Sequence, residues 1–169
     1  LECTNTRDGL RDEDYLTTDV HQWVDDHLRA SKERWTALGF STGGYCALDL
    51  AVRHPDLYRR VISFDGYGQA LNDHYARGLW RSRSDRDAHS PDRWVQNHPA
   101  QAQSFYLSAG THDRDAAKDA LASWSALGRS GWRTPDSDLV VEPGGRHTFP
   151  AWRAAFLPGL KWAFAPTVP

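Results

Sequence analysis

One stretch of six residues, Gly39-Phe40-Ser41-Thr42-Gly43-Gly44, constrains the fold of this chain more than any other feature. It lies between an apolar run and a stretch with helical character, which is the setting of a sharp strand-to-helix turn. We expect Gly39 and Gly43 to stand where a side chain would collide with neighbouring backbone and where the backbone angles favour glycine. Such a turn projects Ser41 outward, so that a histidine and a substrate could both reach its hydroxyl.

The turn predicts chemistry as well as shape. The backbone N–H of Thr42 would open the following helix and point towards an oxyanion. A glycine-rich turn whose serine only caps the helix is the alternative interpretation. The strand before the turn and the helix after it favour a nucleophilic Ser41, because they are the context that such a nucleophile requires.

Apolar periodicity and turn residues predict strands that alternate with helices. The expected strands are 35–40, 61–64, 104–109 and 139–141. The expected helices are 12–28, 43–53, 114–127 and 150–164, the last interrupted at Pro158-Gly159. Strands joined by so short a helical connection pair in parallel. The order therefore predicts one α/β domain over residues 1–169, a three-layer α/β/α sandwich with a mostly parallel sheet.

Composition narrows the class of protein further. The chain has 169 residues, of which 40% are hydrophobic and 25% charged, enough for one globular domain with a sizeable core. The formal net charge of −2 gives no general attraction to nucleic acid, so we expect no nucleic-acid partner. No group of cysteines and histidines is spaced like a metal site, and we expect neither a metal nor another cofactor.

The chain has two cysteines, Cys3 and Cys46. If the fold brings them together, a disulfide would close a loop of about 43 residues and stabilise the domain by roughly 3 to 4 kcal/mol. A disulfide favours an extracytoplasmic location, because such bonds persist in oxidising compartments. The alternative is a pair of buried, inert thiols.

Residues 65–102 form the only long stretch without a regular pattern, and aromatic side chains are interleaved among its charged ones. The stretch leaves the C-terminal end of a strand, and ligands bind at that edge of a parallel sheet. We expect a lid or substrate-binding insertion here. The alternative is a surface excursion whose aromatic residues cover the core.

A nucleophilic serine needs a histidine base and an acid that orients it, and on this scaffold the acid precedes the histidine in the chain. After the third strand, Ala109-Gly110-Thr111-His112-Asp113 places a carboxylate at the C-terminal edge of the sheet. After the fourth, the glycine turn Gly144-Gly145 could deliver an imidazole to Ser41. We therefore assign Ser41 as nucleophile, His147 as base and Asp113 as the orienting acid.

Other residues compete for these roles. Asp65, at the end of the second strand, is the alternative acid, because some hydrolases of this architecture carry it one strand earlier. Asp115 is expected to cap a helix, and Glu142 sits close to its strand. His112 is expected to face solvent or to line the pocket. The remaining histidines are expected to be surface or core residues: His21, His27, His54, His74, His89 and His98.

Three motifs span nearly the whole chain. They are the turn at 39–44 followed by His54-Pro55-Asp56-Leu57-Tyr58, then Ser108-Ala109-Gly110-Thr111-His112-Asp113, then Gly144-Gly145-Arg146-His147 with Trp152 five residues on. Together they resemble the esterase family of α/β-hydrolases, which includes esterase D, feruloyl esterases and the actinobacterial mycolyltransferases. The opening Cys3-Thr4, with Tyr15-Leu16-Thr17-Thr18-Asp19-Val20, is similar to actinobacterial members.

The resemblance implies an α/β-hydrolase fold and a secreted or membrane-tethered serine esterase or acyltransferase. The expected substrate is a small-molecule or lipid ester. We expect four residues to line its pocket: Phe40, Tyr67, His112 and Trp152.

Two departures from the family pattern matter. Asp65-Gly66 stands where relatives commonly have Ser-Gly, which leaves Asp65 as a pocket residue or substitute acid. Only about 34 residues precede the first strand, whereas relatives have several strands there and a loop that supplies the second oxyanion N–H. We therefore expect the C-terminal portion of a larger hydrolase, with a missing N-terminal segment or a second chain completing the sheet.

The leading hypothesis is a serine hydrolase that cleaves carboxylic esters through an acyl-Ser41 intermediate. An acyltransferase of the mycolyltransferase type would differ only in the acceptor alcohol. A non-catalytic binding module that kept the fold is the alternative from another class, and the retained Ser41, Asp113 and His147 argue against it. A peptidase is less favoured, because no site for a peptide terminus is recognisable.

Overall fold

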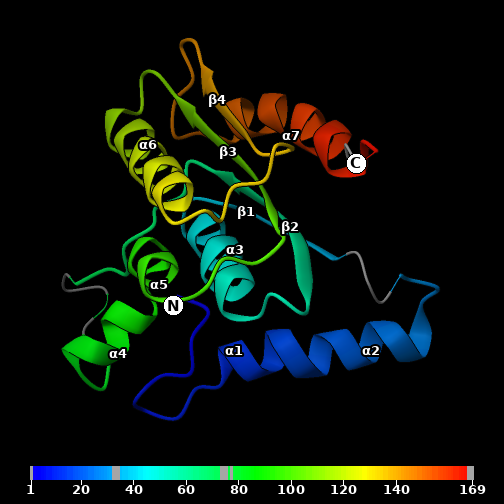
Figure 1. Cartoon of the computed structure of the whole chain (residues 1–169), viewed down its shortest axis with the longest axis vertical. Helices are drawn as coiled ribbons and strands as arrows, with labels where there is room; N and C mark the ends of the chain where they lie inside the picture. Colours follow the sequence, from blue (N-terminus) through cyan, green and yellow to red (C-terminus); the bar gives the residue numbers. More distant parts are fainter. Residues whose placement is uncertain (1, 32–34, 73–75, 77, 167–169) are drawn as a thin grey trace.

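A parallel sheet forms the centre of the molecule (Figure 1). The computed structural model describes residues 2–31, 35–72, 76 and 78–166. Its strands are β1 (Trp35–Phe40), β2 (Tyr58–Phe64), β3 (Ser104–Gly110) and β4 (Asp138–Glu142). They lie in the order β1-β2-β3-β4, and every neighbouring pair is parallel. The predicted α/β architecture is confirmed, with β2 and β4 longer than the apolar runs that indicated them.

Helices cover both faces of the sheet (Figure 1). On one face, α3 (Thr42–Arg53) and α6 (Arg114–Arg129) pack with Val61 and Phe105 in the larger apolar core. On the other, α7 (Phe149–Phe164) packs with Ile62 and Tyr106. Neighbouring residues of one strand thus enter different cores, because side chains alternate between the faces of a strand. The three-layer α/β/α sandwich follows from this alternation.

The expected interruption of the last helix at Pro158-Gly159 is wrong, since α7 continues through both residues. Proline removes the hydrogen bond to the carbonyl four residues earlier and pushes that carbonyl away, and both Pro158 and Ala154 are exposed, where the carbonyl can tilt outward to water. Gly159 is buried against the sheet, and a Cβ there would lie 2.7 Å from Cζ of Phe64. The glycine therefore allows close packing of α7 rather than ending it.

The N-terminal helical stretch is less regular than its sequence suggests. It consists of α1 (Asp12–Asp14), the π-helical turn η1 (Tyr15–Asp19) and α2 (Val20–His27), in place of one regular helix. The carboxylate of Glu13 is buried, whereas Trp23 is 55% exposed. Arg53, the last residue of α3, and His54, which follows it, bind the Glu13 carboxylate and so stabilise it in its buried position.

Residues 65–102 contain two short helices, α4 (Arg83–Ala88) and α5 (Pro91–Asn97), so the expectation of an irregular stretch is wrong for these parts. Ser82 caps the first through Asp85 N–H, and Pro91 begins the second, as its fixed φ permits. The Tyr45 hydroxyl donates to the His89 carbonyl at 2.7 Å. Helix α5 packs between α3 and α6, and thus belongs to the helical layer.

A disulfide ties the start of the chain to α3. The sulfurs of Cys3 and Cys46 are bonded, and 43 residues separate them in sequence. The neighbouring Glu2 is buried and accepts hydrogen bonds from the Tyr67 hydroxyl at 2.9 Å and from the Leu71 N–H. Helices long and apolar enough to cross a membrane do not occur in the described part of the chain.

Candidate active site

Ser41 lies at the junction where β1 ends and α3 begins. Its backbone has φ 54°, in the left-handed region that residues with side chains rarely adopt. The Ser41 N–H donates to the Phe64 carbonyl at 2.9 Å, and its own carbonyl accepts from Tyr45 at 3.1 Å. Bonds to β2 and to the first turn of α3 therefore hold the strained turn in place.

The two glycines around Ser41 play different parts. A Cβ at Gly39 would lie against the backbone of Gly43, so the expected collision is present there. A Cβ at Gly43 would meet nothing within 4 Å, and the expectation for that residue is wrong. The positive φ also falls on Ser41 and not on either glycine. One residue that the sequence did not single out, Gly44, needs to be small, since a Cβ there would lie 2.7 Å from Oγ of Ser63.

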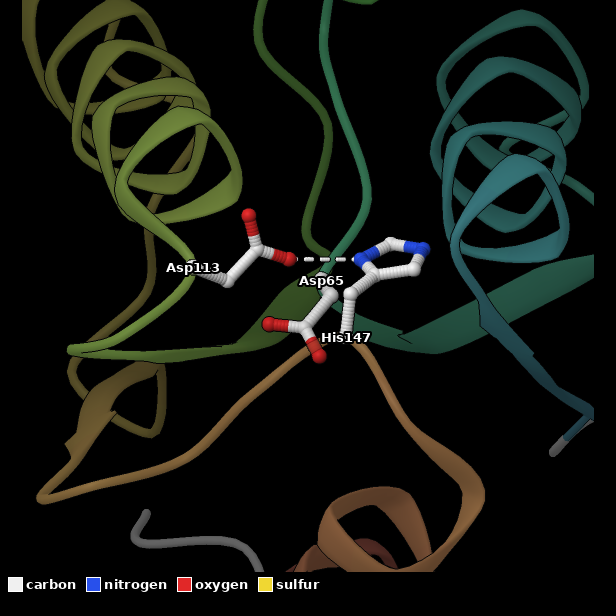
Figure 2. A group of neighbouring side chains, drawn as sticks. All are labelled: Asp65, Asp113 and His147. Atoms are coloured by element: carbon white, nitrogen blue, oxygen red, sulfur yellow. Dashed lines mark hydrogen bonds and ion pairs between the residues drawn. The ribbon is translucent and has the colours of Figure 1, made fainter.

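An imidazole lies within hydrogen-bond distance of the serine hydroxyl. His147 Nε2 is 2.9 Å from Ser41 Oγ. The Nδ1 atom of the same ring is 2.6 Å from Asp113 Oδ2, a contact that Figure 2 shows. With the tautomer protonated at Nδ1, the ring donates to the carboxylate and accepts the serine proton at Nε2. The His147 side chain is 44% exposed, while that of Asp113 is 15% exposed. The structure thus brings together three residues that the sequence assigned to one site.

Asp113 divides its carboxylate between two partners. Oδ2 faces His147, and Oδ1 accepts from Ala116 N–H at 3.3 Å as the N-cap of α6. The cap expected of Asp115 is therefore made by Asp113, and Asp115 is an exposed residue of the first turn. Glu142 ends β4 and lines a small pocket beside the site. The structure places neither Asp115 nor Glu142 on the imidazole.

The loops that carry the acid and the histidine pack directly against each other. The Gly144 N–H donates to Thr111 Oγ1 at 2.8 Å, and the His112 N–H donates to the Gly145 carbonyl at 2.9 Å. A Cβ at Gly110 would lie against the backbone of Gly145. A Cβ at Gly145 would likewise lie 2.8 Å from Gly110 Cα, and Gly144 has a φ of 73°, so both residues of the turn before His147 favour glycine.

The four expected pocket residues take different positions. Phe40 stacks on Phe64, and Trp152 lies against both Phe40 and the edge of the His147 ring. The Tyr67 hydroxyl is 3.5 Å from Thr42 Oγ1, at the first turn of α3. His112 is exposed.

Glu2 was missed by the sequence reasoning. It holds the Tyr67 hydroxyl, and burial raises the pKa of its carboxyl above the ordinary value. Only its position next to Cys3 could have pointed to it, because a disulfide at Cys3 would draw its neighbour into the core.

Asp65 directly follows β2 and lies close to the carboxylate of Asp113 and the imidazole of His147. Donor atoms of Asp65, Asp113 and His147 lie within 4.8 Å of one another, a spacing that could hold a cation and that the sequence did not suggest (Figure 2). Each of the three already has a hydrogen-bond partner within the protein. All three side chains are therefore held by hydrogen bonds within the protein.

The other described histidines have structural contacts. His21 stacks on Trp35, and His89 is buried with Nδ1 2.9 Å from Asp49 Oδ2. His54 contacts Glu13. His27 and His98 lie beside the carbonyls four residues before them. His74 falls outside the described residues, so the prediction for it stays untested.

Comparison with known proteins places these features in context. A family model described as "Putative esterase" matches residues 5–163. Over 160 residues, the chain is 26% identical to an uncharacterised protein of Corynebacterium glutamicum, an alignment that covers 88% of this chain and 37% of that protein.

Two solved structures share the architecture. FphF of Staphylococcus aureus, a fluorophosphonate-binding serine hydrolase, superposes with a TM-score of 0.79 at 20% identity, covering 98% of this chain and 68% of that one. A ferulic acid esterase superposes with a TM-score of 0.76 at 15% identity, covering 95% and 63%. At these identities the likeness shows the fold. The chain spans about a third of the curated relative's length, 37%, and just under two thirds of the ferulic acid esterase, 63%.

Proposed function

The chain belongs to the esterase family of α/β-hydrolases, and on that premise we propose that it is a serine esterase acting through an acyl-Ser41 intermediate. The observation that carries the proposal is the hydrogen-bond chain from Ser41 through His147 to Asp113, at 2.9 and 2.6 Å. A hydroxyl next to an imidazole, itself next to a carboxylate, is the arrangement that activates serine.

The geometry supports a two-step reaction. His147 Nε2 takes the proton of Ser41 as its Oγ attacks the ester carbonyl, and Asp113 stabilises the imidazolium. The Thr42 N–H, in the first turn of α3, donates to the oxyanion. His147 returns the proton to the departing alcohol and then activates a water that releases the acid.

Exposure of the site favours hydrolysis over acyl transfer. Among the residues that the structure describes, the His147 side chain is 44% exposed, which leaves a path for water to the acyl group. An acyltransferase must exclude water in favour of another alcohol. The aromatic ring of Trp152 beside His147 suits an apolar acyl group of a small-molecule or lipid ester.

We also propose an extracytoplasmic location. The Cys3–Cys46 disulfide supports it, because cytoplasmic reductants keep most thiols reduced.

The experiment is covalent labelling with a fluorophosphonate, followed by mass spectrometry of the labelled peptide. We expect the label on Ser41, none on the Ser41→Ala variant, and a burst of product when the wild type meets an activated acyl ester. Circular dichroism of Ser41→Ala checks that the variant is folded. A folded wild type that takes no label and shows no burst would overturn the proposal.

A further inference from the structure

Asp65 stands in a conformation that residues with a side chain rarely adopt. Its φ is 47°, in the left-handed region, and only 6% of the residue is exposed. The Asp65 N–H donates to the Ser108 carbonyl at 2.7 Å, which holds the chain in this turn. Glycine would adopt such a backbone at lower cost, by roughly 1 kcal/mol. The side chain must therefore supply something that offsets the strain.

The carboxylate of Asp65 binds two segments at once. Oδ1 accepts from the Gly110 N–H at 3.0 Å, and Oδ2 accepts from Trp152 Nε1–H at 2.6 Å. Both partners are donors, and a carboxylate can accept from both. An amide of the same shape could accept from only one, because its NH₂ would face the other donor.

Both partners of Asp65, Gly110 and Trp152, contact a proposed catalytic residue. The Gly110 carbonyl accepts from the Asp113 N–H at 3.0 Å, so this bond anchors the loop that carries the acid. Trp152 lies in the first turn of α7, and its indole packs edge-on against the imidazole of His147, with ring centroids 5.0 Å apart. The buried Asp65 carboxylate thus connects the loop that carries Asp113 with the tryptophan that packs against His147.

Beside the contact between the two loops, the packing against the sheet is incomplete. A small pocket lies among Asp65, Ser108, Gly145 and Trp152, at the place where the two loops meet the sheet. His147 itself is 44% exposed, so few neighbours confine its ring. Hydrogen bonds from the sheet therefore add to the contacts between the two loops in fixing their orientation.

Asp65 has no part in the proton path. The Nδ1 of His147 is bonded to Asp113, and Figure 2 shows the Asp65 carboxylate beside this pair without a bond to either residue. The structure therefore does not support Asp65 as the substitute acid.

We propose that Asp65 is a positioning residue, whose carboxylate holds the acid loop through Gly110 and the histidine loop through Trp152, and so keeps the imidazole in line with Ser41. The inference rests on the proposed esterase function. A displacement of about 1 Å in such a site costs on the order of 100-fold in rate.

The test compares three variants: Asp65→Asn, Trp152→Phe and the double variant. We expect Asp65→Asn to lower kcat on an activated ester by about 10- to 100-fold, with KM changed by less than about threefold. Trp152→Phe keeps the ring against His147 but removes the indole donor. In the double variant the Asn oxygen can accept from Gly110 N–H without an opposing donor, so its kcat should exceed that of Asp65→Asn alone.

Asp115→Asn is the matched control, because it removes an exposed carboxylate from the first turn of α6 and should leave kcat within about twofold of the wild type. Proton NMR gives a readout besides activity: the downfield resonance of the His147–Asp113 hydrogen bond should broaden in Asp65→Asn and persist in Asp115→Asn. A wild type that fails to label with fluorophosphonate overturns the proposed function. If the wild type labels but Asp65→Asn leaves both kcat and the resonance unchanged, this inference is overturned. It is also overturned if the double variant recovers none of the kcat that Asp65→Asn loses.

Discussion

At Glu13, a single buried carboxylate joins the N-terminal helical stretch to the core. Its Oε1 lies 2.6 Å from Arg53 and 2.7 Å from Nε2 of His54. Burial by itself would raise the pKa of Glu13, but the hydrogen bond from His54 and the charge and hydrogen bond of Arg53 outweigh it and lower the pKa to about 2. The carboxylate is therefore stabilised in its charged form.

This shift predicts acid sensitivity. A carboxyl whose pKa is lower in the folded state adds stability above its unfolded pKa of 4.5, and that stability is lost as the pH falls towards 2. Glu13→Gln should lower the free energy of unfolding by about 3 kcal/mol at pH 7, with the deficit shrinking between pH 4.5 and 2. Urea unfolding at pH 7, 5 and 3 measures it.

Asp12→Asn serves as the control, since Asp12 makes neither of these contacts with Arg53 and His54. An equal deficit for Glu13→Gln at pH 7 and pH 3 would contradict the prediction.

Among the elements, the junction of β1 and α3 shows how one small residue permits a turn. Backbone atoms of Gly43 occupy the space that a side chain at Gly39 would need, whereas the space beside Gly43 itself is open. The two glycines of the same motif therefore offer a matched pair of substitutions.

Gly39→Ala should destabilise the protein by about 1 to 3 kcal/mol or more, since the new methyl group forces the strand and helix apart. Gly43→Ala should leave stability unchanged or raise it by up to about 1 kcal/mol, because alanine favours a helix. Thermal unfolding of both variants measures the difference. Equal melting temperatures for the two variants would show that the junction does not depend on this contact.

For the whole molecule, the disulfide is the covalent link between the N-terminal segment and the core. A loop of 43 residues corresponds to about 4 kcal/mol in the chain-entropy model. Reduction, or the Cys3→Ser/Cys46→Ser variant, should lower Tm by about 10 °C for a domain of this size. Thermal unfolding with and without reductant tests this. The reductant should have no effect on the double variant, and an unchanged Tm of the reduced wild type would contradict the expectation.

The edge of the sheet at β1 predicts how the chain associates in solution. Within the residues that the structure describes, β1 pairs with β2 and with no other strand. Strand edges with unpaired backbone groups associate with other chains. When residues 1–169 are prepared on their own, we expect self-association as the concentration rises, observed by sedimentation velocity, and less of it in Thr36→Lys, because lysine on an edge strand opposes pairing. A single monomeric species at every concentration would count against it.

Much of the fold could be predicted from local patterns. The strand at Trp35–Phe40 was predicted to the residue, and the parallel order followed from the short helical connection after it. Residues 83–97 were harder, because α4 and α5 are short helices whose polar sequence carries little periodicity. The break expected at Pro158 was wrong because helix propensity penalises proline equally at every position. The free-energy cost of a proline inside a helix also depends on whether the freed carbonyl can reach water.

Local sequence patterns were enough to place the four strands, a sharp turn at Ser41, and the two loops that carry Asp113 and His147, because each depends on residues close together in the chain. The positive φ at Ser41, the choice of the carboxylate that meets His147, and the bond between Asp65 and Trp152 depend on packing in three dimensions. Ser41 and His147 are 106 residues apart, and Asp65 and Trp152 are 87 apart. Such contacts depend on strand register and helix packing, in which one residue's shift turns a side chain to the opposite face of the sheet.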